Sequence, residues 1–350
     1  MKKVDYIIVG LGLAGIAFCE QCLAAGKTFI AYDKGGPGAS RVAAGLYNPV
    51  ILKRYTLPWK SVEQFDVAIP YFRKLEQKLN VSLLHPMPVR KIFSSIEDQN
   101  NWFSATDNAE LRRFIKPEIV RDETSQVKAP FDYGEVLETG RVDITKLQEV
   151  YETYLIEHDA FAKAEFYHNA IQFNQTTVIY DEVEAEHIIF AEGYGVKSNP
   201  YFQKLPLVGN KGEYIIIKAP HLQQEAAVKS SFFIVPLGND LYKVGATFNW
   251  TDKNSVPSGA AREELIDKLD AIITCDYEIV DQQAGMRPTT GDRRALLGKH
   301  PRHPQLALLN GLGTRGIMAG PTLAKYLFEH LENEMSLPEE IDIARFPKKF

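Results

Sequence analysis

The chain contains few cysteines, no long apolar run and no excess of positive charge. Only 3 of its 350 residues are cysteine, an odd and small number that fits a reducing compartment. No window holds the roughly 18 uninterrupted apolar residues that a membrane helix needs. The formal net charge of −5 gives no general attraction to nucleic acid or to an anionic membrane. These absences predict a cytoplasmic protein that does not act on a membrane.

Metal-binding and redox motifs are also missing. The 8 histidines include no His-x-His and no His-Glu-x-x-His pattern, so we expect no metal site. Cys19 and Cys22 have the spacing of a redox pair, but they fall well inside a predicted helix, away from the N-terminus that would lower a thiol pKa. We therefore expect both to be core thiols. Basic residues at Lys53, Arg54 and Lys60 could form a local patch, although a solvated face is the favoured interpretation.

The opening stretch of the chain, in contrast, carries a clear pattern. Val4–Val9 is apolar and predicts a strand, Leu13–Ala25 predicts a helix that ends at Gly26, and Thr28–Tyr32 predicts a second strand. This order of strand, turn, helix and strand is that of a dinucleotide-binding fold.

Three glycines follow the first strand in the spacing G-x-G-x-x-G, and the third falls in the first turn of the predicted helix. Gly10 allows the tight turn, Gly12 lets a pyrophosphate approach the backbone, and Gly15 lets helix and strand pack closely. The helix N-terminus adds amide donors and the positive end of its dipole. Asp33 follows at about the 20-residue distance at which an acid reaches the ribose hydroxyls. The context predicts a dinucleotide site.

A second stretch of small residues follows. Lys34 opens a glycine-rich loop that runs to Ser40 and continues into Arg41–Pro49, which reads RVAAGLYNP. Small residues let a backbone approach a flat ligand, and the Ser40 hydroxyl can serve a phosphate or a ribose. The residues alone fit a loop that fills a tight corner equally well.

Two later blocks have residue types that suit a binding site. Ala284–Gly298 contains Arg287 followed by Pro288, and a guanidinium pairs a carboxylate bidentately. An arginine tied to a structural acid is the alternative. Asn310–Met318 follows a predicted strand and precedes a predicted helix, whose N-terminus can stabilise negative charge on a ligand.

The rest of the chain predicts further helices and strands. Some of them return to the sheet of the nucleotide-binding fold, and the others form a second, sheet-containing domain that is inserted into it. The predicted elements are helices over 59–80, 144–157 with Asp143 as N-cap, and 261–273, strands over 170–173, 177–180 and 185–191 that return to the first sheet, and strands over 213–218, 231–235 and 241–248.

Together these blocks resemble the D-amino acid oxidase family of FAD-dependent oxidoreductases. The segment VAAGLYNP resembles the second flavin-contacting segment of the family, and Val4–Asp33 resembles the first. Ala191-Glu192-Gly193 is similar to the strand end that returns beneath the adenine. The triplet Thr314-Arg315-Gly316 is most similar to glycine oxidase and to the oxidoreductase domain of the bifunctional tRNA 5-methylaminomethyl-2-thiouridine enzymes.

The resemblance implies an α/β fold, α+β overall, in which a Rossmann-like FAD-binding domain is interleaved with an antiparallel-sheet substrate domain. We assign residues 1–82, 141–205 and 284–350 to the FAD-binding domain, and 83–140 and 206–283 to the substrate domain. The resemblance implies non-covalent FAD, since the last block lacks the cysteine that tethers flavin in sarcosine-oxidase relatives. The implied cofactor-binding residues are Gly10, Gly12, Leu13, Ala14, Gly15, Asp33, Lys34, Ser40, Ala44, Gly45, Leu46, Ala191, Gly193, Gly311, Gly313, Thr314, Arg315, Gly316 and Ile317.

The resemblance also assigns the substrate contacts. It implies that Arg287 is the catalytic residue that grips a substrate carboxylate above the flavin. We expect Arg315 to contribute to substrate binding, and Tyr47 and Phe233 to be pocket walls, with ordinary core packing equally open for the two aromatic residues. The Phe233 strand lacks the tyrosine that glycine oxidase carries over its substrate, so a hydroxyl contact is missing.

The predicted activity is oxidation of the C–N bond of a small amino acid or an N-substituted glycine, by hydride transfer to the flavin. One alternative is a tRNA wobble-uridine oxidoreductase acting on carboxymethylaminomethyl-uridine. It is disfavoured because the net charge is acidic and a methyltransferase domain is missing from the chain. A flavin-binding protein without turnover is the other alternative.

Overall fold

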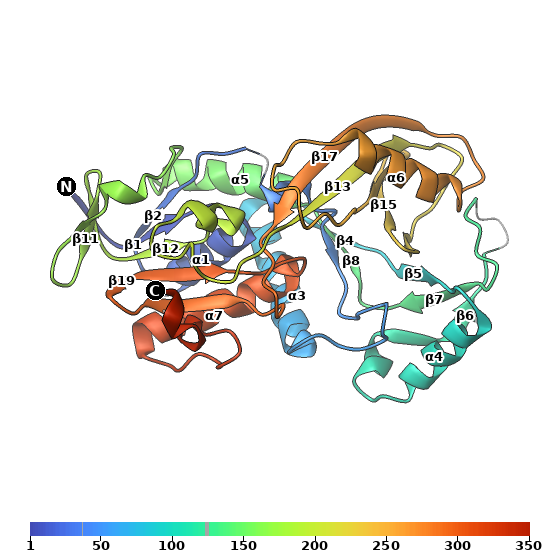
Figure 1. Cartoon of the computed structure of the whole chain (residues 1–350), viewed down its shortest axis with the longest axis horizontal. Helices are drawn as coiled ribbons and strands as arrows, with labels where there is room; N and C mark the ends of the chain where they lie inside the picture. Colours follow the sequence, from blue (N-terminus) through green and yellow to red (C-terminus); the bar gives the residue numbers. More distant parts are fainter. Residues whose placement is uncertain (37, 123–125) are drawn as a thin grey trace.

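Two large sheets and a small third one form the frame of the computed structural model, which describes residues 1–36, 38–122 and 126–350 (Figure 1). Pro37 of the predicted glycine-rich loop lies outside the described residues. Both chain termini lie in the half of the molecule that holds the first sheet (Figure 1). The mixed α/β architecture confirms the predicted fold class.

The first sheet contains the opening strand and is largely parallel. β1 (Lys2–Val9) pairs in parallel with β2 (Phe29–Tyr32) and β12 (Val183–Phe190), and β12 pairs in parallel with β19 (His303–Asn310). The loops that follow β1, β12 and β19 therefore leave the same edge of the sheet, where ligands bind in such folds. The remaining strands are β9 (Phe161–Ala162), β10 (Gln172–Phe173), β11 (Val178–Tyr180) and β18 (Leu296–His300).

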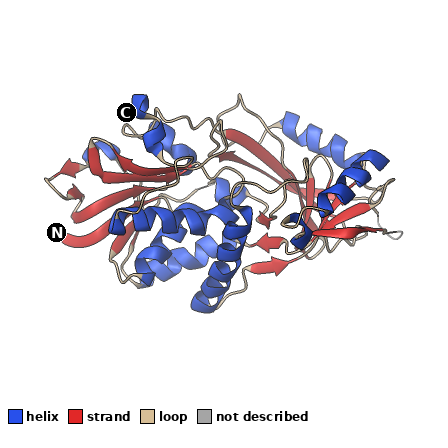
Figure 2. Cartoon of the chain, turned by 90° about the horizontal axis from the view of Figure 1, so that it is seen from below, coloured by secondary structure: helices blue, strands red, loops and turns tan. Residues whose placement is uncertain are grey.

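Three long helices, α1 (Leu13–Ala24), α3 (Ser61–Leu79) and α7 (Gly316–Asn333), pack together beside this sheet. Figure 2 shows helices gathered along one side of the strands in the half that holds the N-terminus. Cys19 and Cys22 are fully buried in α1, and burial raises the pKa of both thiols. Both are core thiols, as predicted.

The second sheet is mostly antiparallel, and its two faces have different neighbours. One face carries Ile215, Val244 and other apolar residues that pack against Leu265 and Leu269 of α6 (Gly259–Asp270). The strands, in spatial order, are β17 (Glu278–Arg287), β13 (Asn210–Lys218), β16 (Leu241–Gly245), β15 (Phe233–Gly238), β14 (Ala227–Lys229), β5 (Val89–Ile92), β7 (Tyr133–Val136) and β6 (Ile115–Val120).

A three-stranded sheet and several short helices complete the described part of the chain. The three strands are β3 (Leu46–Tyr47), β8 (Gly140–Val142) and β4 (Leu84–Pro86). The helices are α2 (Ala39–Val42), α4 (Ile96–Thr106) and α5 (Ile144–Glu157), with 3-10 turns η1 (Leu111–Arg113), η2 (His168–Ala170), η3 (Gly193–Ser198), η4 (Ile343–Arg345) and η5 (Pro347–Lys349).

Most predicted elements are confirmed, with ends that differ by a few residues. α5 has its predicted bounds, and Asp143 caps it by accepting a hydrogen bond from the Lys146 amide at 3.0 Å. No helix was predicted at α4, because Trp102 is its only buried residue and the apolar periodicity is weak. Strands of the two large sheets alternate along the chain, and the domain boundaries proposed above stay a prediction.

Candidate functional site

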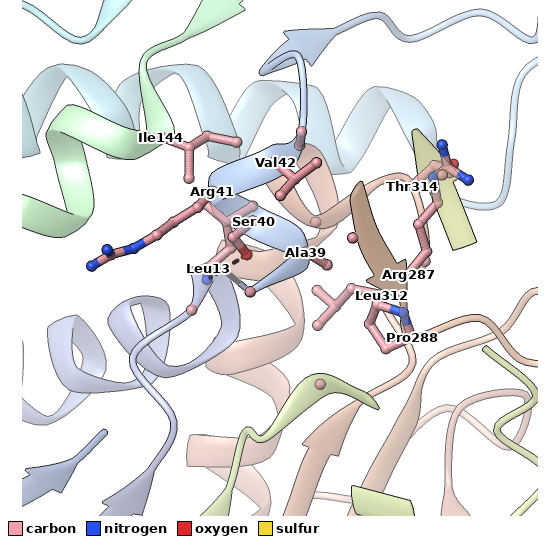
Figure 3. Close-up of a pocket in the computed structure, with 18 of the residues that line it drawn as sticks. Leu13, Ala39, Ser40, Arg41, Val42, Ile144, Arg287, Pro288, Leu312 and Thr314 are labelled. Atoms are coloured by element: carbon pink, nitrogen blue, oxygen red, sulfur yellow. Dashed lines mark hydrogen bonds between the residues drawn. The ribbon is translucent and has the colours of Figure 1, made fainter. Parts of the chain in front are cut away.

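A cavity of about 780 Å³ lies between the edge of the first sheet and one face of the second. The loops that follow β1, β12 and β19 line one side, and β13, β16 and β17 line the other. Figure 3 shows α2, which carries Ser40 and Arg41, between Ile144 on one side and Arg287 and Thr314 on the other. The predicted cofactor residues and Arg287 therefore line one cavity.

Most of the predicted cofactor residues line this cavity, although they come from five separate parts of the chain. Those that line it are Gly10, Gly12, Leu13, Ala14, Asp33, Lys34, Ser40, Ala44, Gly45, Leu46, Ala191, Gly193, Gly313, Thr314, Arg315, Gly316 and Ile317.

The glycine turn is packed too tightly for side chains. Gly10 has φ +98°, and a Cβ there would stand 2.6 Å from the Ala191 carbonyl oxygen. A Cβ on Gly15 would stand 1.9 Å from the Gly10 carbonyl oxygen. Gly15 does not line the cavity. Its role is to let the helix pack closely against the chain that follows β1, as the sequence predicts.

The N-terminus of α1 opens onto the cavity with its amides available. Gly12 is the N-cap residue and has no side chain to cap this helix. The Ser40 Oγ accepts a long hydrogen bond of 3.4 Å from the Leu13 amide (Figure 3). Free amides and the helix dipole favour an anion at this point.

Asp33 lies at the same end of the cavity and already holds the backbone. Its Oδ2 accepts from the Leu11 amide at 2.6 Å and its Oδ1 accepts from the Gly35 amide at 2.6 Å. Each carboxylate oxygen keeps a further lone pair for a ligand hydroxyl. Asp33 therefore ties the glycine turn to the loop after β2 while it faces the cavity.

Glu192, for which the sequence indicated no side-chain role, also lines this end. Its Oε1 lies 2.7 Å from His168 Nε2, and its Oε2 accepts from Asn199 Nδ2 at 2.8 Å. The long acidic side chain is thus held by two partners from other segments. No sequence motif links Glu192 to His168 or Asn199, so only the folded structure shows that the three side chains lie together.

One face of α5 forms a wall that the sequence reasoning missed. Ile144, Gln148 and Glu152 recur every four residues, and all three line the cavity. Gln148 Nε2 donates to the Leu11 carbonyl at 2.9 Å, while its buried Oε1 has no hydrogen-bond partner in the described structure. The four-residue spacing was the available signal, because it places side chains on one helix face.

Two glycines that line the cavity, Gly45 and Gly285, are packed closely against neighbouring segments. Gly45 has φ +76°, and a Cβ there would stand 2.2 Å from the Val142 carbonyl oxygen of β8. A Cβ on Gly285 would stand 3.1 Å from Val42 Cβ, because α2 packs directly on β17. A flat ligand can pass here along the backbone.

The loop before α7 brings the last predicted block to the site. The Gly313 amide donates to the Pro288 carbonyl at 3.0 Å, which joins this loop to the segment that carries Arg287. Arg315 is the N-cap residue of α7, and no side-chain oxygen caps this helix among the residues described. Burial lowers the pKa of the Arg315 guanidinium to about 10, and the nearby charge of Arg293 contributes.

Arg287 lies on the cavity face of β17 and is 9% exposed. Its Nη1 donates to Asn210 Oδ1 at 2.6 Å, and both terminal nitrogens approach the Thr247 carbonyl, at 3.3 and 3.4 Å. Its guanidinium carbon lies 4.6 Å from the centre of the Phe248 ring. No acidic side chain pairs with it in the part of the chain that the structure describes.

Gly212 of β13 makes room for that arginine. It pairs with Gly285 across the two strands, two residues along from the pair Asn210 and Arg287 and so on the same face of the sheet. A Cβ on Gly212 would stand 1.9 Å from Arg287 Nη2. The guanidinium thus crosses the bare backbone of the neighbouring strand.

Three predicted site residues lie away from the cavity surface. Tyr47 is 5% exposed and packs in the core against Phe65, and burial raises the pKa of its hydroxyl to about 12. Of the two alternatives for Tyr47, a pocket wall or ordinary core packing, the structure shows core packing. Gly311, with φ +77°, lies behind the lining, as Gly15 does. Phe233 does line the cavity, as expected for a pocket wall.

These residues fit a dinucleotide along most of the cavity. An uncapped helix N-terminus, the glycine turn without side chains, the Asp33 carboxylate and the unpartnered Gln148 Oε1 suit phosphates and ribose hydroxyls. The far end holds Arg287, whose charge has no acidic partner among the described residues. The fold and the site define a dinucleotide-dependent oxidoreductase that joins a cofactor site to an anion site.

Comparison with known families makes the assignment specific. The family described as FAD dependent oxidoreductase (DAO) matches residues 5–330, and the chain belongs to this family. It is an FAD-dependent oxidoreductase, and FAD is its cofactor.

Curated relatives and solved structures agree with this family. Glycine oxidase of Bacillus licheniformis is 23% identical over 384 residues, covering 99% of this chain and 98% of that protein. The tRNA 5-methylaminomethyl-2-thiouridine biosynthesis bifunctional protein MnmC of Azoarcus sp. (strain BH72) is 28% identical over 189 residues, covering 47% of this chain and 30% of that protein. The chain thus spans less than a third of that relative.

Two crystal structures have a similar fold. Glycine oxidase from Geobacillus kaustophilus has a TM-score of 0.81 at 19% identity, covering 99% of this chain and 98% of its own. Iminodiacetate oxidase from Chelativorans sp. BNC1 has a TM-score of 0.81 at 16% identity, covering 96% of this chain and 98% of its own. In the part of the chain that the structure describes, no helix has the length and apolar character to cross a membrane.

Proposed function

We propose that the protein oxidises the C–N bond of a small amino acid or an N-substituted glycine. The observation that carries this proposal is Arg287, a buried guanidinium in the cavity that is held by neutral groups only, among the described residues. A buried charge without an ionic partner is unfavourable, so the site is prepared for an anion. Glycine and iminodiacetate, named for two similar proteins, are both amines that carry carboxylates.

The chain's own residues position the substrate and shape its pocket. Arg287 holds the carboxylate, and Asn210 together with the Thr247 carbonyl keep the guanidinium in place. Phe233 offers an apolar wall where a hydroxyl contact is missing, which favours an N-substituted amine over glycine. When held by the glycine turn after β1 and the loop before α7, FAD would supply the acceptor for a hydride from the carbon next to nitrogen. No side-chain base is assigned to this step.

The FAD is proposed to be held non-covalently. None of the three cysteines lines the cavity. Cys19 and Cys22 lie inside α1, and Cys275 is half-buried in the unit of the second sheet. Acid precipitation should therefore release the flavin into the supernatant.

The decisive experiment is anaerobic bleaching of the flavin by candidate amines. Glycine, sarcosine, D-amino acids, proline and carboxymethylaminomethyl-uridine are mixed with the holoenzyme, and the loss of flavin absorbance is followed. Arg287→Ala should lose most of the activity toward carboxylate substrates, on the order of 100-fold in kcat/KM. Arg302→Ala is the matched control, since Arg302 is exposed and away from the cavity lining.

Two outcomes of this experiment would contradict the proposed function. Wild-type activity in Arg287→Ala would contradict the anchor assignment. A flavin that no amine bleaches would indicate a flavin-binding protein without turnover.

A tRNA-linked substrate is the second candidate, and the surface near the cavity favours it. Lys53, Arg54, Arg293 and Arg294 have no acidic side-chain partner among the described residues, and Arg294 lies 5.7 Å from the centre of the Trp59 ring. Cations without an acidic partner beside a half-buried aromatic ring suit phosphates and bases. A salt-sensitive gel shift with bulk tRNA tests this, and the net charge of −5 predicts weak binding.

A further inference from the structure

The acidic residues that line the cavity are confined to one end, where the cations Lys34 and Arg41 also lie. The acids are Asp33, Glu152 and Glu192, and all three lie at the end of the glycine turn and α5. They are engaged with backbone amides, with Arg41 and Lys163, and with His168 and Asn199, respectively. The end that holds Arg287 is lined by cations without a lining acid among the described residues.

These cations differ in how far their charge is satisfied. Lys253 Nζ donates to three backbone carbonyls, at 2.7 to 3.1 Å, and so has no donor left. Lys229 Nζ donates to the Ser230 carbonyl at 2.5 Å and lies 4.9 Å from the centre of the Phe233 ring. Arg287 is held by neutral groups, as described above.

Arg315 is a lining cation whose side chain has no partner of its own in the described part of the chain, and Lys53, an exposed lysine, is another. Arg315 faces the cavity, and no hydrogen bond or ion pair of its side chain is present among the residues that the structure describes. The positive charge of Arg293 acts on it and has the same sign. A half-buried guanidinium beside a like charge is unfavourable until an anion arrives.

We propose that the preferred substrate is an amine that carries two acidic groups, one held by Arg287 and the second by Arg315. This deepens the proposed function and depends on it. The Gly313 to Pro288 hydrogen bond joins the segments that carry the two arginines, so both project from neighbouring backbone. A substrate with one carboxylate neutralises only one of the two, and a dianion neutralises both.

Sarcosine and iminodiacetate test the proposal, because they differ only in that iminodiacetate has a carboxylate on its second methyl carbon. The holoenzyme should show a kcat/KM at least 10-fold higher for iminodiacetate. Arg315→Gln should lower kcat/KM for iminodiacetate at least 10-fold more than for sarcosine, and Arg315→Lys should recover part of the difference. Arg302→Gln should leave both values unchanged. An unchanged preference in Arg315→Gln would overturn the proposal.

A second measurement does not require turnover. Malonate has two carboxylates and no amine, and acetate has one carboxylate, so both probe anion binding only. Malonate should raise the Tm of the holoenzyme more than acetate does, and Arg315→Gln should abolish that difference. If no amine is oxidised but the malonate effect depends on Arg315, the proposed function fails and the second anion site stands. If Arg315→Gln weakens FAD binding and leaves the malonate effect intact, Arg315 serves the cofactor and the proposal is wrong.

Discussion

Gly212→Ala is the sharpest test of how the arginine site is built. The added methyl group would stand 1.9 Å from Arg287 Nη2 and 2.2 Å from its guanidinium carbon. Gly212 does not have a positive φ, so the backbone tolerates alanine and the collision with the side chain decides the effect. The guanidinium must leave its place between Asn210 and the Thr247 carbonyl.

The expected effect follows from the contacts that the displaced guanidinium would make. Hydrogen bonds to a charged group contribute about 1.5–3 kcal/mol each, and a displaced fork loses at least one of two to a carboxylate. A loss of about 3 kcal/mol lowers kcat/KM on the order of 100-fold. The fold should survive, because the clash is with the movable end of a side chain.

The assay compares three proteins. FAD content, Tm and kcat/KM toward a carboxylate amine are measured for the wild type, for Gly212→Ala and for Gly259→Ala. Gly259 is the matched control, because a Cβ there has no neighbour within 4 Å. Wild-type kcat/KM in Gly212→Ala with full FAD content would refute the idea that the position of Arg287 depends on the bare backbone of β13.

Two further predictions concern cofactor binding and stability. Asp33→Asn should weaken FAD binding to the apoprotein about 10-fold in a fluorescence titration, because one oxygen that accepts from the Leu11 or Gly35 amide is lost; unchanged affinity would contradict the assigned role. Lys243→Met should raise the unfolding free energy of the apoprotein by about 2 kcal/mol at about pH 7. Burial lowers the pKa of Lys243 from 10.5 to about 8, so the penalty on its charge is complete below that pKa and fades as pH rises toward 10.5. The unfolding free energy of the wild type should therefore rise as the pH goes from about 8 to 10.5. Burial lowers the pKa of Lys229 in the same way, so the two lysines share this rise, and Lys243→Met should lose about half of it in urea titrations at several pH values. An undiminished rise in Lys243→Met would contradict the assignment.

Local patterns predicted a large part of the fold and the cofactor end of the site. The strand, glycine turn and helix at residues 4–25 follow from neighbours in the chain, because backbone conformation and close packing there depend on residues a few positions apart. Arg287 was also predictable, since its block resembles the family's own. Most of the predicted cofactor residues do line the cavity, although many other lining residues were not predicted.

Other features depend on segments that are distant in the sequence. Tyr47 stands beside small residues that line the cavity, yet its side chain points into the core. Gly212 matters only because β13 and β17 pair in the register that sets it beside Arg287. Register and side-chain direction are set by long-range strand pairing, which no local pattern contains.

The chain's glycine spacings, small-residue loops and Arg287 block thus predicted an FAD-dependent oxidoreductase with a carboxylate anchor. Only the folded structure showed that one face of α5 lines the cavity, that neutral groups hold Arg287, and that the charge of Arg315 has no ionic partner among the described residues. The physical reason is that each cofactor-binding segment owes its conformation to residues close together in the sequence, whereas charge balance in a cavity depends on every segment that reaches it.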